Sequence, residues 1–211
     1  MIFGAHSPEY LRVWWGMGES RWNGAYYYAL EIEGRIIPEV ETDRDWVLLN
    51  SEGMCRDHSI VFVHDNLNAE RYRWLEGYDD LLLVCGIPET VPKVAHLGTA
   101  VYLPLSIDVA EVSRHRRKRR SGTCYAGRVQ KIGEFPSNVD VVSGLPRDEF
   151  LDRLSRYRHA YCVGRTALEA KCLGVEVLPY DPRFPDPDRW EVMDNLTAAR
   201  ILQQHVDRID G

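Results

Sequence analysis

Residues 163–180, VGRTALEAKCLGVEVLPY, restrict the fold of this chain more than any other segment. An apolar run at 160–163 leads into Gly164, a helical pattern follows at once, and Gly174 ends that pattern before a second apolar run at 175–179. A strand, a helix and a strand in so short a span predict a parallel β-α-β unit. The start of its helix is then expected at the carboxyl end of a strand.

The start of this predicted helix is a candidate anion site, because helix amides and the positive end of the helix dipole favour a phosphate group. Gly164 allows close approach to the backbone, the amide of Arg165 follows it, and Thr166 can donate a hydrogen bond. We expect Glu169 in the first helical turn. The alternative is an ordinary helix start, at which Glu169 only interacts favourably with the helix dipole.

Similar alternation of apolar runs and helical patterns extends along the chain and predicts an α/β fold with parallel sheets. The run at 81–85 is fully apolar, which is typical of a strand covered on both faces. Further runs of strand length lie at 10–15, 46–50, 60–64, 100–103, 124–126 and 139–142. The sequence therefore predicts two small Rossmann-like lobes with parallel sheets.

A basic run marks the expected boundary between the lobes, since six of the seven residues from Arg114 to Arg120 are Lys or Arg. We expect an N-terminal lobe at 1–112, a second lobe at 121–187 and a C-terminal helix at 188–211 that packs back across the protein. In a chain of net charge −6 such a run can contact a nucleic-acid backbone. The alternative is a solvated linker.

Composition excludes several classes of protein. No apolar run is long enough to span a membrane, and the N-terminus lacks the basic and apolar regions of a signal peptide. The five cysteines form no C-x-x-C pair, which favours reduced thiols in a cytoplasmic protein. We expect no metal centre, because the histidines have no suitable spacing and the aspartates at 181–188 are better explained as turn and cap residues.

Three motifs of the second half resemble the nucleotide-binding domain of nucleotide-sugar glycosyltransferases with two Rossmann-like domains, the GT-B type. They are GRVQK at 127–131, GLPRDEF at 144–150 and GRTALEAKCLG at 164–174. The resemblance implies that Arg128 and Lys131, close behind Gly127, contact the donor diphosphate. It also implies that Glu169 binds the donor ribose. No cofactor is expected beyond the nucleotide-sugar itself.

Many retaining members of that family carry a second glutamate eight positions before the ribose-binding one, and this chain has Tyr161 there. The expected transfer therefore needs a general base for the acceptor hydroxyl. Asp65 is our first candidate and His64 the second, because both follow the apolar run at 60–63 and so lie at a carboxyl edge. The alternative is that Asp65 forms a turn and caps the next helix.

A glycine-punctuated loop at 16–24 follows the first apolar run and is a candidate acceptor site through Glu19, Ser20 and Arg21. It fails the dinucleotide fingerprint G-x-G-x-x-G because Arg21 stands at the third glycine, so we exclude an NAD site. A plain loop is the alternative. The predicted function is sugar transfer from a nucleotide-sugar to an acceptor, and the second hypothesis is a non-catalytic nucleotide- or nucleic-acid-binding protein with the same fold.

Overall fold

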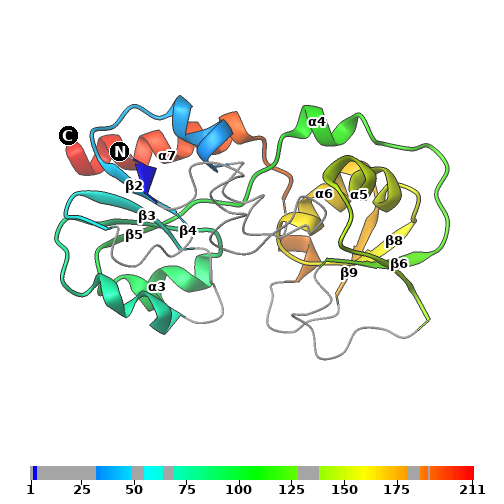
Figure 1. The fold of residues 1–211 in the computed structure, drawn as a ribbon, viewed down its shortest axis with the longest axis horizontal. Coiled ribbons are helices and arrows are strands. Elements are labelled where there is room, and N and C mark those ends of the chain that lie inside the picture. Colours follow the sequence, from blue (N-terminus) through cyan, green and yellow to red (C-terminus); the bar gives the residue numbers. More distant parts are fainter. Residues whose placement is uncertain are drawn as a thin grey trace. The chain divides into compact units, whose positions relative to one another are not determined.

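The structure is a computed structural model that describes residues 2–3, 32–48, 55–63, 69–127, 138–179, 186–189 and 191–211. This part of the chain forms two compact units (Figure 1). The first contains the described residues up to Leu105 together with Leu196–Gly211, and the second contains those of Ser106–Asn195. The division precedes the basic run, so that 114–120 belongs to the second unit rather than forming a boundary.

The first unit contains a parallel sheet whose five described strands follow one another in chain order. The strands are β1 (Ile2–Phe3), β2 (Asp45–Val47), β3 (Ser59–Val63), β4 (Leu82–Cys85) and β5 (Thr99–Tyr102). Every residue of β3 and β4 is buried, as the continuous apolar sequences predict for strands with both faces covered. Pairing of Ile60 with Leu82 and of Val63 with Cys85 fixes their register.

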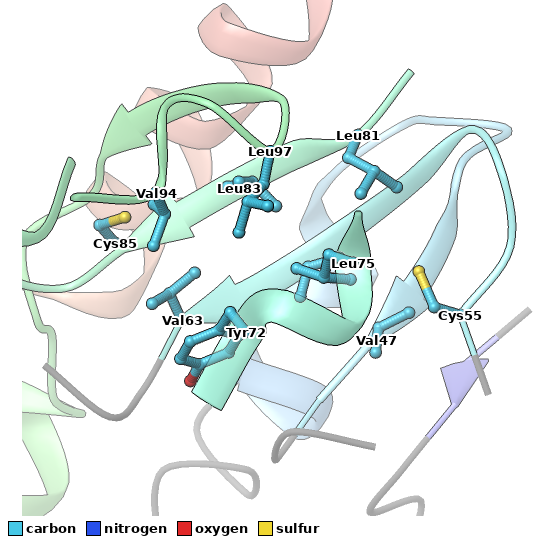
Figure 2. Packing of buried hydrophobic residues seen from close by; sticks show 11 residues of the cluster. Val47, Cys55, Val63, Tyr72, Leu75, Leu81, Leu83, Cys85, Val94 and Leu97 are labelled. Carbon is cyan, nitrogen blue, oxygen red and sulfur yellow. The ribbon is translucent and has the colours of Figure 1, made fainter. Parts of the chain in front are cut away.

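Short helices cover one face of this sheet. The 3-10 helix η3 (Ala69–Leu75) connects β3 to β4, and η4 (Pro88–Thr90) with α3 (Val91–Val94) connects β4 to β5. Connections between neighbouring parallel strands are right-handed. Two successive connections that add strands in the same direction along the sheet therefore place their helices on the same face. Figure 2 shows Tyr72 and Leu75 of η3, with Val94 of α3, packed against this face of the strands. Each such fully buried leucine or valine contributes roughly 1.5–3 kcal/mol.

The opposite side of the first sheet carries α7 (Asn195–Asp210), as the ribbon in Figure 1 shows. The C-terminal residues Leu196–Gly211 belong to the first unit, although they follow the second unit in the sequence. The helix begins at Asn195, later than the predicted 188, and a 3-10 turn, η6 (Pro187–Arg189), precedes it. Two further short helical turns, η1 (Ile32–Ile36) and η2 (Ile37–Glu39), also belong to this unit.

A buried arginine fastens α7 to the amino edge of the first sheet. The side chain of Arg44, only 1% exposed, donates from Nε to both carboxylate oxygens of Asp210 at 2.9 and 3.1 Å. It also donates from Nη2 to Oδ1 of Asp80 at 3.0 Å. His58 completes the cluster, with its ring nitrogens facing Asp80 and, at 3.0 Å, Asp43. Arg44 precedes β2, His58 precedes β3 and Asp80 precedes β4. The cluster therefore joins three strands and, through Asp210, the helix α7.

The second unit contains a four-stranded parallel sheet with the order β7-β6-β8-β9. The strands are β6 (Thr123–Ala126), β7 (Asp140–Val142), β8 (His159–Tyr161) and β9 (Glu176–Leu178). Cys124, Ala160 and Val177 lie in one register row and are buried. Both units thus have parallel α/β sheets, consistent with Rossmann-like lobes.

Helices α5 (Arg147–Leu154) and α6 (Arg165–Leu173) lie on one side of the second sheet (Figure 1), and α4 (Val109–Ser113) packs against α6. The helix α6 ends at Gly174 as predicted, because φ is 77° there. A Cβ at this position would also come within 2.8 Å of Arg120 Nη2. The guanidinium of Arg120 donates to the Gly174 carbonyl at 2.6 Å and so caps the negative end of the helix.

The Arg44 cluster predicts a pH dependence of stability. Hydrogen bonds to Asp80 and Asp43 raise the pKa of His58 above its usual 6.5. Its stabilising contribution is therefore complete below 6.5 and is lost as the pH rises through the folded-state value. Asn tolerates the positive φ of 60° at this position, so His58→Asn removes the ion pairs with little backbone strain.

Urea unfolding of the wild type and of His58→Asn at about pH 6 and about pH 8.5 measures the effect. The difference in free energy of unfolding between the two proteins should shrink at the higher pH. Asp80 and Asp43 have lowered pKa values, and their contributions are lost only as the pH falls through values below 3.8. A difference that does not change with pH would contradict the prediction.

Candidate functional site

The strand order of the second sheet places two of the predicted site segments beside each other. From β6 the chain goes to β7 on one side, and it later returns through β8 on the other side. Open parallel sheets bind ligands beyond the carboxyl ends of the two strands at such a reversal. Gly127 directly follows β6, and Gly164 follows β8, which is the parallel neighbour of β6.

Gly164 has a conformation that only glycine adopts readily, with φ 62° and ψ −140°. Its carbonyl accepts hydrogen bonds from the amides of Ala167 at 3.0 Å and Leu168 at 3.3 Å. The amides of Arg165 and Thr166 precede these bonds at the positive end of the nine-residue helix α6. Within the described residues no side-chain cap occupies this helix start, as a backbone anion site requires.

Gly127 is the second constrained glycine of this edge, with φ 145°. A Cβ added there would lie 3.0 Å from the hydroxyl of Tyr125, a buried residue two positions earlier in β6. The backbone after β6 therefore turns where a side chain would be crowded. Arg128 and Lys131 follow in the chain but lie outside the described residues.

The side chains at the start of α6 are held by the second unit itself. Arg165 donates from Nε to the carbonyl of Ser106 at 3.3 Å, while Thr166 is 6% exposed. These contacts fix the first helical turn relative to the segment before α4. These contacts position the helix start and do not involve its backbone amides.

Glu169 was expected in the first turn of the helix, but α6 begins at Arg165 and its first turn contains no acidic residue. The carboxylate lies deeper, with 0% of the side chain exposed, and accepts a hydrogen bond from Arg147 Nη1 at 2.6 Å. Arg147 also donates from Nε to Glu111 at 2.9 Å. Contact of Glu169 with a donor ribose stays a prediction, and it would require this ion pair to rearrange.

The Glu111–Arg147–Glu169 group joins the helices α4, α5 and α6. Burial alone lowers the pKa of Arg147, but the carboxylates of Glu169 and Glu111 outweigh this effect and raise it. The guanidinium therefore stays charged, and it lets an otherwise inaccessible carboxylate remain ionised. The sequence alone did not reveal this group. One local signal was present, because Asp108 and Glu111 have the spacing of a helix cap, and the Glu111 amide donates a hydrogen bond to Asp108 Oδ1 at 2.7 Å.

The remaining predicted site residues lie outside the described part of the chain. Asp65 and His64 follow β3 in the sequence, as expected for residues beyond a carboxyl end. Glu19, Ser20 and Arg21 belong to the loop predicted to hold the acceptor. Their roles stay predictions.

Burial raises the pKa of four of the five cysteines and so lowers their reactivity: Cys55, Cys85, Cys124 and Cys162. All five are free, and burial raises the pKa of Cys85 and of Cys124 to about 12. Such thiols stay protonated and are poor nucleophiles.

The described ranges contain neither a metal centre nor a membrane-spanning helix. His, Cys, Asp and Glu side chains do not gather there in threes as a metal centre would need. Likewise, no helix in that part of the chain has the length and apolar character to cross a bilayer.

No protein-family model, curated protein or solved structure matches this chain.

Gly164→Ala should lower the free energy of unfolding by about 1–3 kcal/mol, because alanine is strained at this φ and ψ. Gly77→Ala is a matched control, since a Cβ there meets nothing within 4 Å. Urea unfolding of both variants measures the difference. Equal stability of the two variants would show that the turn before α6 is not constrained.

Arg147→Ala should lower the free energy of unfolding by about 3–5 kcal/mol, because it removes the cation that pairs with the buried Glu169 carboxylate at 2.6 Å. The exposed Arg153 of the same helix offers a control, and its change to alanine should cost less than about 0.5 kcal/mol. The double variant Arg147→Met/Glu169→Leu replaces both charged side chains by apolar ones. It should recover much of the free energy of unfolding that Arg147→Ala loses. A double variant as unstable as the sum of its single changes would contradict an ion pair.

Proposed function

We propose that this chain is a glycosyltransferase that takes its sugar from a nucleotide-activated donor. The donor diphosphate binds at the carboxyl edge of the second sheet, beyond β6 and β8. The observation that carries the proposal is the position of Gly127 and Gly164 after the two strands at which the strand order reverses. The sequence resemblance of 127–131 and 164–174 supplies the class of ligand.

In this proposal the second unit neutralises the diphosphate. Arg128 and Lys131 supply two cations behind Gly127, and the start of α6 supplies backbone amides and the helix dipole. These groups stabilise the negative charge that develops on the leaving diphosphate, so the mechanism uses no metal ion. Glu169 would contact the ribose only after releasing Arg147.

The transfer step needs one proton acceptor. The acceptor hydroxyl attacks the anomeric carbon of the sugar, the bond from that carbon to the phosphate oxygen breaks, and the nucleoside diphosphate leaves with the bonding electrons. Asp65, or His64 in its place, takes the hydroxyl proton. Glu19, Ser20 and Arg21 hold the acceptor.

A second candidate is a protein that binds nucleotides without transferring a sugar. Two observations favour it: Tyr161 stands where many retaining members have a glutamate, and the carboxylate of Glu169 is engaged by Arg147. Incubation with a panel of nucleotide sugars separates the two candidates. Release of nucleoside diphosphate supports the enzyme, whereas a nucleotide-dependent rise in melting temperature without turnover supports the binding protein.

Arg128→Ala should weaken the affinity for a nucleoside diphosphate by about 10-fold or more, since it removes a charge-assisted contact with phosphate. The melting temperature without ligand should stay nearly unchanged. Isothermal titration with UDP and with GDP measures the affinity. Arg200→Ala, at an exposed position of α7, removes the same charge elsewhere and should bind as the wild type does. An unchanged affinity of Arg128→Ala would overturn the proposed donor site.

A further inference from the structure

The amino edge of the second sheet brings together two basic segments that are distant in the sequence. One is the basic run, which connects α4 to β6, and the other is 153–158 at the end of α5. The amide of Ser121 donates to the carbonyl of Arg156 at 3.0 Å, and the amide of Arg158 donates to the carbonyl of Gly122 at 3.1 Å. These bonds hold the two segments side by side just before β6 and β8 begin.

Most cations of these segments face solvent. Arg116, Lys118 and Arg119 of the first segment are exposed, as are Arg153 and Arg158 of the second. Within the described residues no ion pair involves these five side chains. Their charges are therefore available to a partner, in a chain whose net charge is −6.

A shared carboxylate orders the arginines between them. Asp152 accepts hydrogen bonds from Arg117 and, at 2.6 Å, from Arg156, so one negative charge serves two guanidinium groups. These bonds, with that from Arg117 first, lower the pKa of Asp152. The cluster keeps an excess of positive charge, while its arginines already have restricted side-chain conformations. Such restriction reduces the entropy lost when a ligand binds.

We propose that the exposed cations of 116–119 and 153–158, which we call the amino-edge basic surface, bind the phosphate backbone of a nucleic acid. Seven of the residues involved carry positive charge, and all but Lys118 are arginine, whose guanidinium binds phosphate in a bidentate manner. Phosphate contacts of this kind supply most of the affinity in sequence-independent binding.

The chemistry of the surface favours nucleic acid over a protein or a membrane. Stable protein interfaces and membrane-surface segments both need apolar or aromatic anchors. The exposed large hydrophobic residues of the described chain are Tyr102, Val141, Val192 and Leu196, and none of them belongs to either segment. A surface with dense charge and no apolar anchor fits a continuous polyanion.

This surface is separate from the candidate donor site, because parallel strands carry their amino and carboxyl ends at opposite edges of the sheet. The inference therefore does not rest on the proposed glycosyltransferase activity. A protein that failed to bind UDP could still bind nucleic acid here, and the reverse also holds.

Fluorescence anisotropy with a labelled single-stranded DNA of about 20 nucleotides, between about 50 and 200 mM salt, tests the proposal. The wild type should bind with an affinity that falls steeply as salt rises. The variant Arg116→Ala/Lys118→Ala/Arg119→Ala should bind about 10-fold or more weakly, and its slope of log affinity against log salt should be about 2 smaller. Arg153→Ala/Arg158→Ala, from the other segment, should also weaken binding if the two form one surface.

The control Arg73→Ala/Lys93→Ala/Arg208→Ala removes three exposed cations from the first unit and should bind as the wild type does. All substituted side chains are exposed, and thermal melting checks that each variant stays folded. The proposal is overturned if the wild type does not bind DNA at the lower salt concentration, or if the 116–119 variant and the control bind equally. Binding to phosphatidylserine vesicles without binding to DNA would likewise overturn it.

Discussion

The ion pair between Arg147 and Glu169 is the interaction on which the second unit depends. A carboxylate with no exposed surface can stay ionised only beside a fixed cation, and Arg147 supplies that cation at 2.6 Å. The same guanidinium reaches Glu111, so that one side chain sets the spacing of α4, α5 and α6. Since α6 begins directly after Gly164, the position of the candidate phosphate site follows from this buried group. The first unit uses the same device, because Arg44 joins Asp80 and Asp210.

The β-α-β unit of the second half could be predicted from the sequence because its signals are local. Apolar runs predict β8 and β9, and Gly164 and Gly174 delimit α6 by positive φ values of 62° and 77°. The environment of Glu169 could not be predicted in this way, since Arg147 lies 22 residues earlier and contacts it only in the folded chain. The division of the chain before the basic run depends on contacts of the same kind. A run of charges suggested a linker, whereas Arg117 and Arg120 bond to Asp152 and Gly174 of the second unit.

Our two proposals assign different recognition chemistry to the two edges of the second sheet. At the carboxyl edge, glycines and a helix start offer backbone groups to one compact anion. At the amino edge, arginine side chains from two segments offer distributed charge to an extended one. Both follow from the direction of parallel strands, because helix starts lie at one end of the strands and helix ends at the other. Basic side chains at helix ends also interact favourably with the negative end of the helix dipole.

The first unit is discontinuous, since Leu196–Gly211 belongs to it although Ser106–Asn195 of the second unit is synthesised before it. During synthesis, Asp210 therefore leaves the ribosome after every strand of the β7-β6-β8-β9 sheet, and only then can Arg44 form its ion pair with it. The second unit can acquire its native pairing while the first still exposes the sheet face that α7 covers. The strands of the first sheet are thus synthesised first, but the first unit is completed last. Until α7 is added, the exposed face of this sheet is the part of the chain that needs protection from aggregation.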